Sequence, residues 1–107
     1  MKVAYSEASR DDVIRQFRYY LVELNLPEIA VRFREAVRGA TKAIGERPYA
    51  GPSYSVNNAQ LRSLRSWPVR GFDARVYFLV EGDKVSVIRI LHGKRNVRRI
   101  LEREKII

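Results

Sequence analysis

The sequence contains no cysteine and a single histidine, His92, in 107 residues. Disulfide frameworks, cysteine nucleophiles and zinc sites of cysteine and histidine are excluded, and a serine–histidine–aspartate triad could use only His92. No apolar run approaches the ~18 residues of a membrane span, and the first residues lack the apolar segment of a secretory signal. We therefore expect a soluble, cytoplasmic protein with no membrane partner, metal or other cofactor.

Acidic residues are the scarcer charged group. The chain has 21 Lys+Arg against 12 Asp+Glu, a formal net charge of +9. Residues 1–60 hold 9 basic and 7 acidic groups, whereas residues 61–107 hold 12 basic and 5 acidic groups, so the second half carries the field. Most of the basic residues are arginine, which grips phosphate or carboxylate planes with two hydrogen bonds. A polyanionic partner is expected, either nucleic acid or an acidic protein; the alternative is that the charge only solvates the surface.

The spacing of apolar residues predicts a strand followed by two helices. Lys2–Tyr5 is a short candidate strand, and Ser9 with Asp12 has the spacing of a helix start. Pro27 is well placed to begin a second helix, because its missing N–H has no partner there. So short a connection predicts an antiparallel helical hairpin. The first stripe is Val13, Ile14, Phe17, Tyr20, Leu21 and Leu24; the second is Ile29, Phe33, Ala36, Val37, Ala40 and Ile44, ended by Gly45 and Pro48.

The apolar period changes in the second half. Residues 74–80 and 85–91 are rich in β-branched and aromatic side chains, and Glu81-Gly82-Asp83 between them is a tight-turn signal, so we expect a β-hairpin. A strand within residues 61–69 is expected at a sheet edge or bulge, because Pro68 cannot donate to a ladder.

Asn96 is expected to cap a short final helix. The predicted order is then β-αα-β-β-β-α, an α+β fold in which an N-terminal helical hairpin packs on a small antiparallel sheet. No repeat or linker interrupts the chain, so residues 1–107 are expected to form a single domain.

Arg75 and Arg89 interrupt the apolar runs of the two hairpin strands. An arginine on a β-face needs an acid partner, a bound anion or open water. Pairing with Asp73 or Glu81 inside the sheet is the alternative to a binding role. The candidates for binding a target or anion are Arg62, Arg65, Arg70, Arg75, Arg89, Lys94 and Arg95.

His92 follows the last strand and precedes Gly93-Lys94-Arg95-Asn96. Its titration range would allow general acid or base work, but a structural hydrogen-bonding role is the commoner one. The segment could bind an anion through its N–H groups and two cations, or could be a plain strand-to-helix turn. Paired carboxylates, a zinc-protease motif and a glycine-rich phosphate loop are all missing.

Four segments carry a family resemblance that covers nearly the whole chain. They are Leu61-Arg62-Ser63-Leu64-Arg65, Val69-Arg70-Gly71-Phe72, Val76-Tyr77-Phe78 and Ile88-Arg89-Ile90-Leu91-His92-Gly93-Lys94-Arg95-Asn96. With the strand and helical hairpin before them, they resemble the RelE/ParE family of bacterial toxins from type II toxin–antitoxin systems. The pattern from Arg65 to Asn96 is more similar to the ParE branch, described as poisons of DNA gyrase, than to the RelE branch of ribosome-dependent mRNA endonucleases.

The endonuclease branch matches only in part. Its arginine immediately before the apolar core of the first hairpin strand corresponds to Arg75, and its glycine-lysine-arginine turn corresponds to Gly93-Lys94-Arg95. Its lysines on the preceding strand and its tyrosine in the last helix have no counterpart here, and only Glu102 or Glu104 in that helix could take a proton.

The resemblance therefore implies a toxin bound in a hetero-oligomer by a cognate acidic antitoxin, with DNA gyrase as target. The alternative is a ribosome-dependent endonuclease that cleaves mRNA with Arg75, Arg95 and His92 as catalytic candidates. A second alternative is a non-toxic basic module that contacts nucleic-acid phosphates without chemistry.

Overall fold

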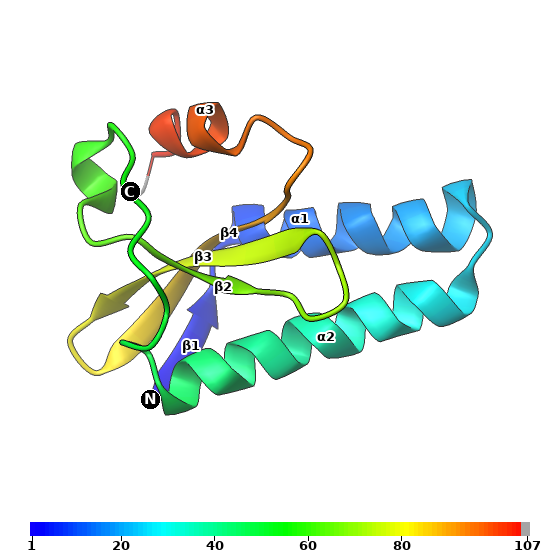
Figure 1. The fold of residues 1–107 in the computed structure, drawn as a ribbon, viewed down its shortest axis with the longest axis horizontal. Helices are drawn as coiled ribbons and strands as arrows, with labels where there is room; N and C mark the ends of the chain where they lie inside the picture. The colour runs from blue at the N-terminus through cyan, green and yellow to red at the C-terminus, as the bar shows by residue number, and fades with distance from the viewer. Residues whose placement is uncertain (106–107) are drawn as a thin grey trace.

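A computed structural model describes residues 1–105 of the chain. The elements along the chain, drawn in Figure 1, are β1 (Lys2–Tyr5), α1 (Glu7–Arg18), the π-helical turn η1 (Tyr19–Glu23), α2 (Pro27–Glu46), the 3-10 turn η2 (Ala59–Leu61), β2 (Arg65–Pro68), β3 (Ala74–Glu81), β4 (Lys84–His92) and α3 (Val97–Glu102). The predicted α+β fold and the order of its helices and strands are confirmed.

The sheet has four strands in the order β1-β4-β3-β2, and it is mixed. β2, β3 and β4 are antiparallel as expected, and β2 with Pro68 lies at an edge. β1, however, runs parallel to β4, so the expectation of a purely antiparallel sheet is wrong. Both long helices, β2 and β3 lie between β1 and β4 in the chain. No tight turn therefore joins the two strands and forces them to be antiparallel.

α1 begins earlier than the sequence predicts. Ser6, not Ser9, is the cap residue, and its hydroxyl accepts a hydrogen bond from the Ser9 N–H at 3.0 Å. Asp12 lies inside the helix and is 1% exposed, so it is not the acidic residue of a solvent-facing first turn. The helix start was therefore predicted in the right segment but at Ser9, three residues after the true cap.

The helical hairpin packs its inner side on one face of the sheet. Pro27 is the first residue of α2, as predicted. Phe33, Val37 and Ile44 of α2 meet Val76 and Phe78 of the sheet in the larger core. Most of the predicted second stripe is therefore confirmed as core.

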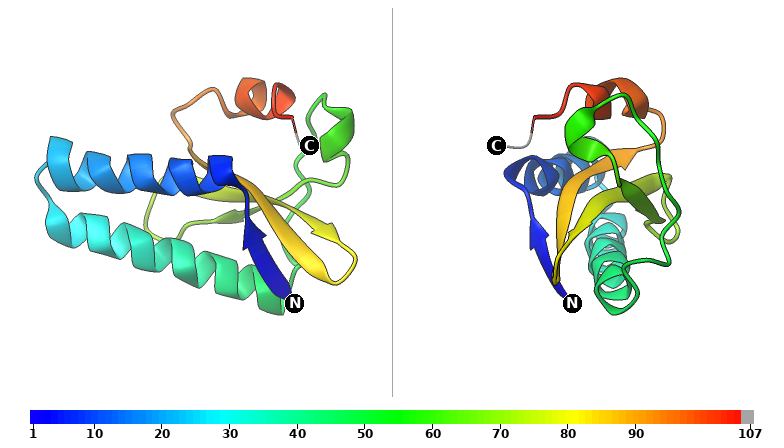
Figure 2. Two further views of the ribbon diagram at one scale, coloured as in Figure 1. Left: turned by 180° about the vertical axis from the view of Figure 1, so that it is seen from behind. Right: turned by 90° about the vertical axis from the view of Figure 1, so that its left-hand side faces the viewer.

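The first stripe is confirmed only in part. Val13 and Tyr20 pack against the core, but Ile14, Leu21 and Leu24 are exposed. Both helices extend beyond the end of the sheet, as Figures 1 and 2 show, so the hairpin tip has no sheet to cover it. The π turn closed by Leu24 N–H and Tyr19 C=O, 3.0 Å apart, also changes the helical phase after Arg18.

A second, smaller core covers the opposite face of the sheet. Tyr77, Leu79 and Leu91 pack there with Leu61 and Leu101 from η2 and α3. The segment before η2 is tied to the end of α3 by Asn58, whose Nδ2 donates to the carbonyl oxygens of residues 101 and 104 at 2.9 and 2.8 Å. Asn96 caps α3 as predicted and accepts from the Arg99 N–H.

β1 pairs with only the first half of β4, and beyond it side chains of α1 and of its cap residue form hydrogen bonds with the backbone of β4. Ser6 Oγ donates to the Ile88 carbonyl at 2.7 Å, and Gln16 Nε2 donates to the Ile90 carbonyl at 2.8 Å. The Asp12 carboxylate accepts from the Ile90 N–H at 2.9 Å. Two helix side chains and the cap residue thus replace the missing strand, which leaves few unpaired backbone groups at this edge.

Asp12 also holds Arg89, and this corrects the partner expected from the sequence. Arg89 Nε and Nη2 each donate to an Asp12 oxygen at 2.7 Å, and Nη1 donates to Glu104 at 3.3 Å. The hydrogen bond to Asp12 raises the pKa of Arg89 further, against the opposing effect of burial. Neither Asp73 nor Glu81 is its partner, because the acid comes from a helix that the sequence pattern could not place above β4.

Removing the Asp12 carboxylate should strongly destabilise the fold. Asp12→Ala leaves a mostly buried Arg89 guanidinium without its main partner, and breaking such a pair costs about 3–5 kcal/mol. Asp11→Ala, one residue away and exposed, should stay within about 0.5 kcal/mol of the wild type. Urea unfolding measures both, and an Asp12→Ala/Arg89→Ala double variant should lose less than the two single losses combined. Equal losses for Asp11→Ala and Asp12→Ala would contradict this role.

Tyr77 should make stability fall in alkali. Its side chain is 3% exposed, and burial, reinforced by Tyr54, raises its pKa to about 12. The unfolded phenol ionises near pH 10, so the stabilising contribution is complete below pH 10 and is lost as the pH rises towards 12. Urea unfolding of wild type and Tyr77→Phe at pH 8 and pH 11 should show the wild type losing stability relative to the variant. A constant difference would mean that Tyr77 titrates normally in the folded protein.

Candidate target-binding surface

The start of β3 and the end of β4 lie together at the end of the sheet opposite the β3–β4 turn. Ala74 pairs with His92, and the Gly93 N–H donates to the Asp73 carbonyl at 2.8 Å. A Cβ at Gly93 would collide with the Asp73 carboxylate, which would then have to move. The predicted Lys94 and Arg95 therefore follow β4 directly beside the loop before β3.

His92 and Lys94 line a pocket of about 290 Å³ between the end of β4 and the helical hairpin. The other residues of its lining are Arg15, Gln16, Tyr19 and Tyr20. His92 Nδ1 accepts from the Lys94 N–H at 3.1 Å, so the neutral ring carries its proton on Nε2. Burial, with Tyr19 and Asp73, raises the pKa of Tyr20, which therefore stays a neutral hydrogen-bonding phenol. A lining of cations and hydrogen-bonding side chains suits a carboxylate or phosphate.

Arg75 lies one pair along the ladder but faces the opposite side of the sheet. It pairs with Leu91, a member of the smaller core, and its Nε donates to Ser66 Oγ at 3.1 Å. His92 pairs with Ala74, which belongs to the larger core. Because successive side chains of a strand alternate between faces, Arg75 and His92 do not converge on one point.

The remaining predicted arginines are spread around the molecule. Arg65 donates to the carbonyls of Tyr49 and Gly51, at 3.2 and 2.7 Å, and its guanidinium lies over the Tyr49 ring. Arg70 lines a groove beside α2 with Trp67 and Pro68. Arg62 and Arg95 are exposed, and Arg89 is held by Asp12 and Glu104 as described above. Of the predicted set, His92 and Lys94 line one pocket together.

Four helix residues of this pocket were not predicted as site residues. Arg15, Gln16, Tyr19 and Tyr20 belong to α1 and η1, whereas the binding residues predicted from the sequence all lie in the basic second half. The arginines of the first helix were a usable signal, but the apolar stripe alone did not reveal which of them would face the end of β4.

A second groove, of about 340 Å³, runs between the two long helices. Its lining is Tyr5, Arg10, Val13, Ile14, Arg34, Val37 and Arg38. The lining combines apolar side chains with three guanidiniums and contains no acid. Outside the lining, Glu35 Oε1 lies 3.8 Å from Arg38 Nη1 and 4.0 Å from Arg34 Nη2. Both ion pairs are long and exposed, and therefore weak, so the two arginines remain available to an acidic partner.

Two further features of residues 1–105 concern metals and membranes. These residues contain no group of three or more histidine, aspartate or glutamate side chains able to hold a metal ion. None of their helices has the length and apolar character needed to cross a membrane.

Comparison with known proteins places the chain in a family. A family model described as the ParE toxin of the type II toxin–antitoxin system parDE matches residues 3–97. The fold is similar to a solved structure described as the chromosomal ParDE system from P. aeruginosa, with a TM-score of 0.72 and 17% sequence identity over 88% of this chain and 97% of that chain. No curated protein matches in sequence. Because the family match spans nearly the whole chain, this protein belongs to the ParE family of toxins from type II toxin–antitoxin systems.

Proposed function

We propose that this chain acts in the cytoplasm as a growth-arresting toxin that inhibits DNA gyrase and is neutralised by a cognate acidic antitoxin. The match to the ParE family over residues 3–97 is the observation that carries the proposal. The surface chemistry supports it, since the net charge is +9 and both clefts described above are lined by cations without acids.

The groove between α1 and α2 is the proposed seat of the antitoxin. Val13, Ile14 and Val37 offer apolar contacts, while Arg10, Arg34 and Arg38 offer charge. An antitoxin segment with apolar side chains on one face and acidic ones on the other would satisfy both. A flexible acidic segment that folds on this groove would gain a fast, salt-sensitive association.

Charge reversal in the groove should weaken antitoxin binding. Arg10→Glu and Arg38→Glu each oppose an acidic partner and should lower affinity for the small acidic protein encoded beside this chain about tenfold or more. Arg32→Glu, exposed on α2 but outside the groove lining, is the matched control and should bind nearly as the wild type does. Titration calorimetry at two salt concentrations measures the difference. Equal effects at all three positions would place the antitoxin elsewhere.

The geometry supports gyrase inhibition over mRNA cleavage. Cleavage by a 2′-oxygen needs a proton acceptor close to the charges that hold the phosphate. His92 faces the opposite side of the sheet from Arg75, as shown above. The helix acids that could replace it are already in contact: Glu104 holds Arg89 at 3.3 Å, and Glu102 accepts from the Asn57 N–H at 3.4 Å.

Arg75 and Arg95 separate the two mechanisms. In an endonuclease, losing one such positioned cation removes about 10²–10³ in rate, so Arg75→Ala or Arg95→Ala would abolish mRNA cleavage. We expect purified wild-type protein to leave ribosome-bound mRNA intact, and both variants to retain growth arrest or lose it only in part. Codon-specific cleavage by the wild type that disappears in Arg95→Ala would establish the endonuclease alternative.

A further inference from the structure

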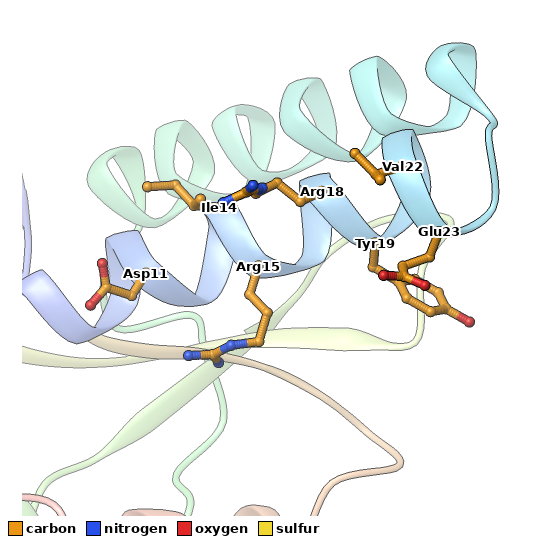
Figure 3. A pocket seen from close by; sticks show the side chains of 7 residues that line it. All are labelled: Asp11, Ile14, Arg15, Arg18, Tyr19, Val22 and Glu23. Carbon is orange, nitrogen blue, oxygen red and sulfur yellow. The ribbon is translucent and has the colours of Figure 1, made fainter.

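The outer side of α1 and η1 forms an exposed surface that shares Ile14 with the groove between the helices, and Arg15 and Tyr19 with the pocket at the end of β4. Its residues are Asp11, Ile14, Arg15, Arg18, Tyr19, Val22 and Glu23, which line a shallow groove of about 640 Å³ (Figure 3). Ile14, Tyr19 and Val22 are 54%, 51% and 65% exposed. Large apolar side chains gathered on one helix with charges beside them are typical of a surface that docks another protein.

These residues form two rows with a spacing of four. Ile14, Arg18 and Val22 form one row, and Asp11, Arg15, Tyr19 and Glu23 form the other. In Figure 3 the first three project on one side of the helix, and Arg15 and Tyr19 project on the other. Arg15 and Glu23 lie four residues before and four after Tyr19, so the second row carries opposite charges on the two sides of an aromatic centre.

That arrangement is complementary to itself. When two such helices pack antiparallel about a two-fold axis at Tyr19, each row faces its own copy. Arg15 then lies opposite the partner's Glu23, and Tyr19 lies opposite the partner's Tyr19. In the other row the side chains interdigitate, with Ile14 beside the partner's Val22 at both ends. We infer that this surface docks a second copy of the chain as an antiparallel, two-fold symmetric helix pair.

One contact in this arrangement is unfavourable. The row Ile14, Arg18 and Val22 brings Arg18 next to the partner's Arg18 near the axis, and each subunit also carries a net charge of +9. A contact between one helix of each subunit lies at the small end of protein interfaces. The dimer is therefore weak and needs a high protein concentration.

Charge swapping tests the inference on the full-length chain made by cell-free synthesis. Sedimentation velocity from about 10 µM to about 1 mM should show a monomer–dimer equilibrium, because contacts this small are typically weak. Arg15→Glu and Glu23→Arg should each lower the association constant about tenfold or more, because each creates two like-charge contacts. A one-to-one mixture of these variants should restore association, since both cross contacts then pair opposite charges. Arg18→Leu should tighten the dimer.

The controls separate this surface from general charge effects. Arg32→Glu and Glu46→Arg make the same changes at exposed positions of α2 and should leave the association constant unchanged. Thermal melting shows whether each variant is folded. Arg15 Nη1 lies 3.5 Å from Asp12 Oδ1, so Arg15→Glu can also lower the melting temperature. In that case the test rests on Glu23→Arg, which should weaken the dimer, and on Arg18→Leu, which should strengthen it. A chain that is monomeric throughout, or a mixture that does not restore association, overturns the inference. The result does not depend on the proposed function, because self-association is measured with neither an antitoxin nor gyrase present.

Discussion

A carboxylate that is 1% exposed inside α1 connects the helical layer to the sheet. Asp12 accepts two hydrogen bonds from Arg89 and one from the Ile90 N–H, so a single side chain satisfies both a buried charge and an open strand edge. A charge so far from water is tolerated only when it is paired and fully hydrogen-bonded. These hydrogen bonds therefore fix α1 over β4, and every surface that includes residues of α1 depends on this position.

Three surfaces depend on that position. Towards the end of β4, α1 and η1 close the pocket that contains His92 and Lys94. Towards α2, α1 forms one wall of the groove with Arg34 and Arg38. Its outer side remains free of the sheet and carries the self-complementary rows around Tyr19. The basic clefts of this ParE-family protein are thus consequences of how one helix is fixed.

Local chemistry made much of the fold predictable. Pro27 marked the start of α2, the sequence around Gly82 marked the tight turn, and Asn96 marked the last cap, each through a constraint acting within a few residues. Features that depend on distant parts of the chain could not be predicted in this way. The direction of β1 and the partner of Arg89 both depend on pairing across more than 75 residues.

The candidate site was predicted less well for the same reason. Arg75 and His92 are close in the ladder, yet strand alternation turns them to opposite faces. Arg15 and Tyr19 lie far from His92 in sequence but share its pocket. The exposure of Leu21 and Leu24 followed from the length of the hairpin beyond the sheet and from the π turn, neither of which a regular helical stripe reveals.

The central claim of the proposed function is that this chain makes DNA gyrase break DNA without itself catalysing a reaction. The most direct measurement is a DNA cleavage assay with purified gyrase, ATP, supercoiled plasmid and this chain. The account predicts that linear DNA accumulates only when gyrase and the chain are both present, and that adding the acidic antitoxin before the chain prevents it. Unchanged gyrase activity at a large excess of correctly folded protein would contradict the account.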